Sequence, residues 1–245
     1  YYQPVLTLDT QAVVGFEALV RWKHPSLGLL PPDQFVAVAE ETGLIVPLGE
    51  WVLKQALDQV AGWRSRLPGA ADLWVSVNLS ARQLRARNVV DMVADALLTS
   101  GMPPNALQLE ITESVLMDEV GPTIDAMKAI RALGVQLAID DFGTGYSSLS
   151  YLKSLPVSSI KIDRSFVGCL GSDDASAIPL VDAIVSMARA LDLEVVAEGV
   201  ETAVQRETLL ELGAGLAQGY LWSRPLEPGL IPAWIAARAR VASIT

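Results

Sequence analysis

The sequence predicts an α/β fold, a single-domain (β/α)₈ barrel in which strands and helices alternate. Three observations predict it. Runs rich in β-forming residues recur along the 245 residues, most later runs follow a segment with helical spacing, and glycines stand where those helices should end. An open, doubly wound sheet is the competing fold, but neither G-x-G-x-x-G nor G-x-x-x-x-G-K-[ST] follows an early strand.

Eight strands are expected. In chain order they are Tyr2–Leu8, Val14–Trp22, Leu73–Leu79, Ala106–Ile111, Val135–Asp140, Ser159–Ile162, Glu194–Glu198 and Leu216–Gly219. Residues 9–11 between the first two suit a hairpin turn, so the barrel should open irregularly. Two segments carry the apolar stripe of a helix: Leu53, Ala56, Leu57 and Val60, then Val90, Val93, Ala94, Leu97 and Leu98. Gly101, Gly134 and Gly213 stand where C-caps are expected.

The composition is that of a folded chain, with 51% hydrophobic and 19% charged residues and a mean hydropathy of +0.36. Acidic side chains outnumber basic ones 28 to 18, and the net charge of −10 argues against binding to duplex nucleic acid. Cys169 is the only cysteine, which favours a reducing compartment, the cytoplasm. His24 is the only histidine, which excludes His-rich metal sites and argues against a Ser-His-Asp triad.

The sequence also bears on domain organisation. No uninterrupted apolar run reaches the length of a membrane span, and no basic start precedes an apolar stretch as in a signal peptide. No linker, low-complexity segment or short repeat divides the chain. Because it starts at Tyr1 without a methionine, we expect residues 1–245 to be one domain cut from a longer protein.

Acidic residues gather at the ends of the expected strands, where barrel enzymes carry their chemistry. They are Glu17, Glu110, Asp140, Asp141 and Glu198, joined by the amide of Asn78. A single carboxylate at such a place is usually a cap or a salt-bridge partner. Several at one barrel mouth would repel each other, and Lys161 alone cannot neutralise them. All-oxygen ligands suit Mg²⁺ or Mn²⁺ rather than zinc, and adjacent aspartates could serve two ions, as in two-metal phosphoryl transfer.

These residues lie in a series of ordered motifs. The motifs are Glu17-Ala18-Leu19, Ser76-Val77-Asn78-Leu79-Ser80, Glu110-Ile111-Thr112-Glu113, Asp140-Asp141-Phe142-Gly143-Thr144-Gly145, Lys161-Ile162-Asp163, Glu198-Gly199-Val200-Glu201 and Gln218-Gly219-Tyr220. The series resembles that of EAL domains, the cyclic di-GMP-specific phosphodiesterases, and covers nearly the whole chain. The resemblance implies a modified TIM barrel with an antiparallel first strand, and hydrolysis of cyclic di-GMP to linear 5′-pGpG.

The resemblance also implies a role for each matched residue. Glu17, Asn78, Glu110 and Asp140 would hold one Mg²⁺ or Mn²⁺, and Asp140, Asp141 and Glu198 the other. Lys161 would contact the attacking water, and Glu201 would support that region. Gln3, Leu19, Arg21, Asp163 and Gln218 would touch phosphate or guanine. Glu113 would anchor the Asp141–Leu152 loop, which couples catalysis to dimer contacts. Ca²⁺ is expected to bind but to inhibit, because its longer bonds misplace the attacking water.

Two other functions remain as alternatives. The first is a catalytically weak cyclic di-GMP receptor or protein-interaction module, as in EAL domains with broken metal motifs. Every ligand position is filled here, which favours the enzyme. The second is an unrelated Mg²⁺-dependent barrel enzyme, which would show a different motif order. As partners we expect a second copy of the chain and an upstream sensory or diguanylate cyclase domain, through which the protein could be tethered to a membrane.

Overall fold

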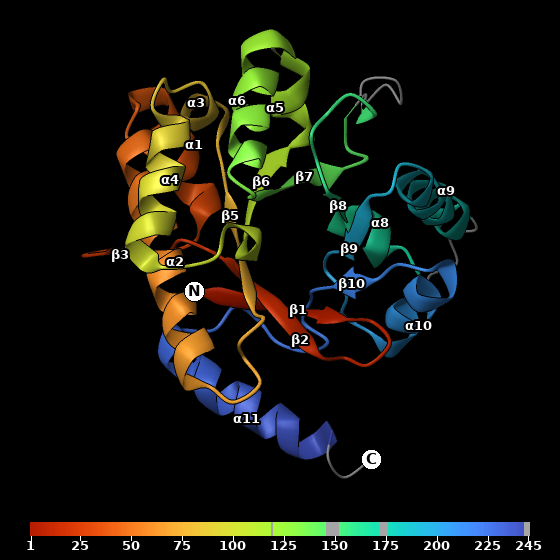
Figure 1. The fold of residues 1–245 in the computed structure, drawn as a ribbon. Coiled ribbons are helices and arrows are strands. Elements are labelled where there is room, and N and C mark those ends of the chain that lie inside the picture. The colour runs from red at the N-terminus through yellow and green to blue at the C-terminus, as the bar shows by residue number, and fades with distance from the viewer. Residues whose placement is uncertain (119, 146–151, 172–175, 243–245) are drawn as a thin grey trace.

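A computed structural model describes residues 1–118, 120–145, 152–171 and 176–242, and it contains a closed barrel (Figure 1). The barrel strands are β1 (Tyr2–Thr7), β2 (Val13–Ala18), β5 (Trp74–Asn78), β6 (Leu107–Thr112), β7 (Gln136–Phe142), β8 (Ser159–Ile162), β9 (Glu194–Ala197) and β10 (Leu216–Ala217). They follow each other around the barrel in the order β1-β10-β9-β8-β7-β6-β5-β2. The α/β barrel is confirmed, and a barrel strand overlaps each expected run.

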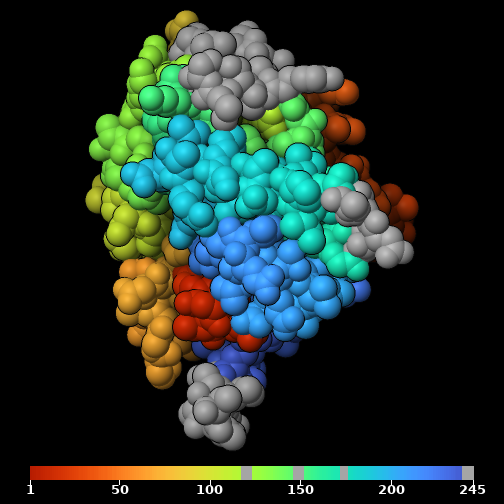
Figure 2. Space-filling view, turned by 90° about the vertical axis from the view of Figure 1, so that its right-hand side faces the viewer, coloured from red at the N-terminus to blue at the C-terminus, as the bar shows by residue number. Residues whose placement is uncertain are grey.

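The first strand makes the barrel irregular, as expected. β1 pairs antiparallel with both β2 and β10, whereas the other neighbouring strands pair in parallel. Its hairpin to β2 closes where the amide of Thr7 donates to the carbonyl of Ala12 at 2.9 Å. Figure 2 shows the N-terminal hairpin, in red, beside the later segment in blue. Arg206 on α10 donates from its Nη2 to the carbonyl of Leu8 at 2.8 Å. This hydrogen bond links the N-terminal hairpin to the C-terminal part of the barrel.

Helices surround the strands in Figure 1. They are α1 (Val36–Thr42), α2 (Ile45–Arg66), α3 (Ala81–Leu84), α4 (Val89–Ser100), α5 (Glu113–Asp118), α6 (Val120–Ala132), α8 (Arg164–Gly168), α9 (Ala177–Ala190), α10 (Ala203–Leu212) and α11 (Ile231–Ala242). Short 3₁₀ helices lie at Pro32–Gln34, Pro104–Ala106 and Pro228–Leu230. Gly101 and Gly213 end α4 and α10 in the left-handed conformation, as C-cap glycines do. No helix in the described ranges is long and apolar enough to cross a membrane.

Two expectations about local structure were wrong. The run Val14–Trp22 is not one strand, because β2 ends at Ala18 and the chain then leaves the barrel for a separate hairpin of β3 (Trp22–His24) and β4 (Gly28–Leu30). The expected apolar stripe on α4 does not include Leu98, which is 83% exposed. Val93 and Leu97 are buried, and one further residue turns the helix by about 100°, away from the core.

Below its mouth, the interior of the barrel is apolar on the side of β1, β9 and β10. Val5, Val196 and Leu216 form a small cluster of their own, with Trp74 packed against it. A Cβ on Gly15 would lie 2.3 Å from the Trp74 ring, so only glycine lets this ring lie across β2. The main core lies between the outer face of the strands and the helices. The polar side chains of the site gather above these apolar clusters, at the mouth of the barrel.

Candidate active site

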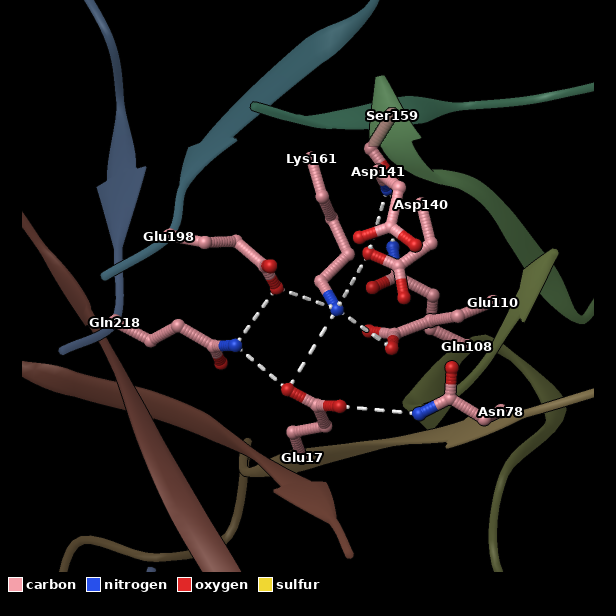
Figure 3. Close-up of polar contacts among 10 residues, drawn as sticks. All are labelled: Glu17, Asn78, Gln108, Glu110, Asp140, Asp141, Ser159, Lys161, Glu198 and Gln218. Atoms are coloured by element: carbon pink, nitrogen blue, oxygen red, sulfur yellow. Dashed lines mark hydrogen bonds and ion pairs between the residues drawn. The ribbon is translucent and has the colours of Figure 1, made fainter. Parts of the chain in front are cut away.

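Lys161 stands at the centre of the barrel mouth, surrounded by carboxylates (Figure 3). Its Nζ lies 2.7 Å from Glu110 Oε2, 2.7 Å from Glu198 Oε1, 3.1 Å from Asp140 Oδ1 and 3.6 Å from Glu17 Oε2. Glu17, Glu110 and Asp140 lie on β2, β6 and β7, and Glu198 directly follows β9. Acidic residues from separate strand ends thus meet at a single ammonium group.

The crowding of charge shifts the pKa values of these groups. Burial raises the pKa of Glu110 well above its usual value, and the nearby carboxylates push it the same way against the pull of Lys161. Burial likewise raises the pKa of Glu198 to about 8. Burial alone would lower the pKa of Lys161, but the carboxylates outweigh it and hold that pKa well above its usual value. Lys161 is therefore a cation, and the raised pKa values of Glu110 and Glu198 indicate that the site is short of positive charge.

Asp140 and Asp141 are consecutive, and a regular strand would point them to opposite faces. The pairing of β7 with β8 shifts register between Ile139 and Phe142, and Asp141 has a φ of 54°. This irregularity turns both side chains toward the mouth. The carboxylate oxygens of Asp140, Asp141 and Glu198 lie within 4.8 Å of one another. Burial and the neighbouring Asp140 raise the pKa of Asp141, which adds to the demand for a cation.

Two side-chain amides hold the carboxylate of Glu17. Asn78 Nδ2 donates to Glu17 Oε1 at 3.0 Å, and Gln218 Nε2 donates to Glu17 Oε2 at 2.6 Å. Gln218 Nε2 also donates to Glu198 Oε1 at 2.8 Å. The NH₂ group of Gln218 therefore links two carboxylates. Its Oε1 is buried and has no hydrogen-bond partner within the described ranges.

Glu113, the first residue of α5, is buried and contacts the segment that follows β7. Its Oε2 accepts hydrogen bonds from the backbone amides of Gly143 at 2.9 Å and Gly145 at 3.3 Å. A Cβ on Gly145 would lie 2.8 Å from Glu113 Oε1, so glycine permits this approach. The expected contact with the start of the loop is thus present, while residues 146–151 of that loop lie outside the described residues.

Two cavities lie beside Leu19, which lines both. The larger, about 470 Å³, runs from Asn78 and Glu110 along the mostly apolar side chains of α1 and α2. The smaller, about 350 Å³, is lined by Arg21 and Tyr1, and the Arg21 guanidinium lies 5.6 Å from the centroid of the Tyr1 ring. Both cavities have the dimensions of small-molecule sites.

The remaining expected site residues lie around the mouth with different surroundings. Gln3 is 9% exposed and sits beside Glu17 in the β1–β2 register. Asp163 caps α8, where its Oδ1 accepts a hydrogen bond from the amide of Ser165 at 3.0 Å. Glu201 is exposed beyond β9, at the start of the turn into α10.

Sequence reasoning missed a polar layer two residues below the mouth on three strands. Gln108 Nε2 donates to Ser159 Oγ at 2.8 Å, below Glu110 on β6 and Lys161 on β8 (Figure 3). Ser76 Oγ and Gln108 Oε1 are buried without a hydrogen-bond partner among the described residues. The signal in the sequence was the repeat of polar residues at alternate positions of buried strands, which indicates one polar inner face.

The donor set fits a divalent cation of the Mg²⁺ class. The convergent groups beside Lys161 are carboxylates and side-chain amides, whose oxygens are the ligand chemistry of hard cations. Lys161 supplies one positive charge against the carboxylates of Glu17, Glu110, Asp140 and Glu198 within 3.6 Å. The Asp140, Asp141 and Glu198 oxygens lie close enough together to bind one ion. The geometry therefore supports metal binding at this mouth.

Comparison with known proteins identifies the family. The EAL domain profile matches residues 1–225 of the chain. The chain belongs to the EAL-domain family. A structure described as PaMucR phosphodiesterase in complex with c-di-GMP is 46% identical, covers 94% of this chain and 92% of its own, and superimposes with a TM-score of 0.89. The EAL enzyme Bd1971 in its cAMP- and cyclic-di-GMP-bound form is 37% identical over 96% of this EAL domain and 63% of its own chain, with a TM-score of 0.91.

Curated relatives of this EAL domain are longer proteins. The bifunctional diguanylate cyclase/cyclic di-GMP phosphodiesterase MucR of Pseudomonas aeruginosa is 47% identical over 228 residues, which is 92% of this chain and 33% of MucR. The cyclic di-GMP phosphodiesterase NbdA of the same organism is 46% identical over 226 residues, 92% of this chain and 28% of NbdA. The EAL domain thus spans about a third of the length of these relatives.

Proposed function

We propose that this EAL domain is a metal-dependent phosphodiesterase that hydrolyses cyclic di-GMP to linear 5′-pGpG. The observation that carries the proposal is the convergence of acidic residues from β2, β6, β7 and the end of β9 around Lys161. Four carboxylates around one ammonium form a site short of positive charge, as a cation-dependent centre requires. The names of MucR and NbdA supply the substrate class.

The proposed ligands form two overlapping sets. The first is Glu17, Asn78, Glu110 and Asp140, and the second is Asp140, Asp141 and Glu198. Asp140 belongs to both sets, and the irregular end of β7 supports this because it brings Asp140 and Asp141 to the same side. Mg²⁺ or Mn²⁺ bound there would activate the attacking water and stabilise the leaving oxygen.

The reaction breaks one phosphodiester bond and needs only water. The water oxygen forms a bond to phosphorus, the bond from phosphorus to one ribose 3′ oxygen breaks, and that oxygen leaves as a hydroxyl. The product is linear and keeps its 5′ phosphate. The Lys161 ammonium faces the mouth among the carboxylates and would donate a hydrogen bond to the attacking water, while Glu201 would support this region from the rim.

Groups at the rim would bind the rest of the substrate. The cavities on either side of Leu19 have room for the guanine bases, and the apolar walls of the larger one would favour a flat ring. Arg21 would pair with a phosphate oxygen through its forked donors. Gln3, Asp163 and Gln218 complete the proposed contacts, with Gln218 restricted to its Oε1 because its NH₂ already binds two carboxylates.

The wider context of the chain also remains a prediction. The matched region covers 33% of MucR and 28% of NbdA, which supports an additional sensory or diguanylate cyclase domain in the full-length protein. A homodimer and a cytoplasmic site of action are predicted on the family resemblance and the cysteine content. Both concern the full-length protein and need the full-length chain for their test.

The test of the proposed function is direct. The protein is incubated with cyclic di-GMP and Mg²⁺ or Mn²⁺, and the linear dinucleotide is followed by chromatography. We expect turnover with either ion, loss of turnover with excess EDTA, and inhibition by Ca²⁺ because its longer bonds misplace the water. Full activity after exhaustive chelation would contradict the metal requirement, and tight binding of cyclic di-GMP without turnover would favour the receptor.

The role of Lys161 has its own test. Lys161→Ala should lower kcat far more than it raises KM, because the proposed partner of Lys161 is the attacking water rather than the bound substrate. A rise in KM at unchanged kcat would instead place Lys161 among the substrate-binding groups.

A further inference from the structure

The Lys161 ammonium is enclosed by carboxylates inside the site. An ammonium group has three N–H donors. Its three nearest oxygen atoms belong to Glu110 at 2.7 Å, Glu198 at 2.7 Å and Asp140 at 3.1 Å. Lys161 is 2% exposed, so water contributes little to its surroundings. The ammonium is therefore paired with carboxylates that the proposed function gives to divalent cations.

Lys161 and a bound metal would share oxygen atoms. Asp140 and Glu198 are two of the three residues whose carboxylate oxygens lie within 4.8 Å of each other, and Asp141 is the third. Asp140 and Glu198 each hold Lys161 as well, whereas Asp141 forms no ion pair with it in the described part of the site. A cation bound by these three residues would lie beside the ammonium, where like charges repel and both positive groups draw on the same oxygens.

The mouth also needs a cation when no metal is bound. Glu17 and Glu110 are 6% and 2% exposed, and buried carboxylates this close together are unstable without a positive partner. Gln218 and Asn78 supply hydrogen bonds but no charge. Lys161 is the positively charged side chain that forms ion pairs with them in the described part of the site.

We propose that Lys161 is the internal cation of the metal-free site and sets its metal affinity, stabilising the empty fold while weakening divalent cation binding. The inference rests on the proposed function for the identity of the ligands. It adds a thermodynamic role to the contact with the attacking water. With Lys161 in place, the domain stays folded when metal is scarce and is loaded only at a higher metal concentration.

The test compares metal affinity in two variants that each lose one positive charge. Lys161→Met keeps the length of the side chain and removes the ammonium. Lys54→Met removes an exposed lysine on α2 and serves as the matched control. Mn²⁺ binding to each protein is measured by titration calorimetry without substrate, and the melting temperature is measured in EDTA and in Mn²⁺.

Lys161→Met should bind Mn²⁺ at least tenfold more tightly than wild type, melt at a lower temperature in EDTA, and recover most of that loss in Mn²⁺. Lys54→Met should match wild type in all three measurements. Equal or weaker Mn²⁺ binding by folded Lys161→Met would overturn the inference. If this variant folds only with metal, release of Mn²⁺ into excess chelator replaces the titration, and release as fast as from wild type overturns it.

These outcomes are independent of the test of the proposed function. Turnover by wild type combined with unchanged affinity in Lys161→Met leaves the phosphodiesterase intact and removes the role in metal affinity. Tighter Mn²⁺ binding by Lys161→Met, combined with no turnover by wild type, supports the role in affinity and contradicts the phosphodiesterase.

Discussion

Two levels of the barrel interior lie two residues apart on the same strands, and different interactions stabilise them: charge pairing at the mouth and apolar burial below it. At the mouth, carboxylates, amides and Lys161 converge. One level down on β1, β9 and β10, the cluster of Val5, Val196 and Leu216 excludes polar groups. The lower level gains free energy from apolar burial, whereas the upper one costs desolvation that only charge pairing offsets. Apolar burial at the lower level therefore helps to offset the cost of the charged mouth.

The lower level is polar on the side of β5, β6 and β8. Gln108 and Ser159 bind each other across the interior, although their strands β6 and β8 are separated by β7. Ala138 lies on β7 between them, and its small side chain leaves room for the contact. Chemistry at the mouth and support beneath it are thus carried by alternate residues of one strand. Substitutions at the two levels should change different measured quantities.

The largest effect is expected at the mouth. Glu17→Ala or Asp140→Ala removes a proposed ligand and should lower turnover by more than about 100-fold, the upper range for losing a partner that only supports a ligand. Glu194→Ala is the matched control, because Glu194 begins β9 at the opposite end of the barrel from Glu198. Rates are measured at saturating Mn²⁺, with circular dichroism to confirm folding. Comparable losses in all three variants would mean that the mouth has no special role.

The next effect concerns stability rather than chemistry. Leu216→Ala should destabilise the fold by about 2–5 kcal/mol, since Leu216 is 6% exposed inside the lower cluster. Turnover per folded molecule should stay close to that of wild type. Urea unfolding gives the stability, and rates far below the unfolding transition give the activity. A large loss of turnover in fully folded Leu216→Ala would show that the lower level also affects catalysis at the mouth.

A smaller effect is expected where the mouth meets the segment after β7. Glu113→Ala removes the acceptor for the amides of Gly143 and Gly145, and such charge-assisted bonds contribute about 1.5–3 kcal/mol. Asp141 lies in the same turn, so its position should loosen and more Mg²⁺ should be needed for half-maximal activity. The fold should remain intact. Superimposable Mg²⁺ titrations for wild type and Glu113→Ala would reduce Glu113 to a charge at the helix N-terminus, worth under about 1 kcal/mol. We also expect any dimer that uses this loop to weaken.

Local sequence patterns were sufficient for the elements but not for the distances between them. The alternation of β-rich and helical segments predicted where the barrel strands lie, because hydrophobic periodicity and secondary-structure propensity are properties of a few consecutive residues. The contact of Lys161 on β8 with Glu17 on β2 arises only on closure of the barrel, when β1 pairs with β10. The register shift at the end of β7 likewise depends on β8. No local pattern encodes either feature.

The smallest effect should come from Leu98, where the sequence pattern gave the wrong face. Leu98→Ala makes the same chemical change as Leu216→Ala, but Leu98 is 83% exposed on α4. Little apolar area returns to water, and alanine is at least as good a helix former as leucine, so stability should change by no more than about 0.5 kcal/mol. Urea unfolding of the two leucine variants side by side isolates burial from residue type. A loss above about 1 kcal/mol at Leu98, with a dependence on protein concentration, would show that this face of α4 is covered in solution by another copy of the chain, because a monomer leaves it in water.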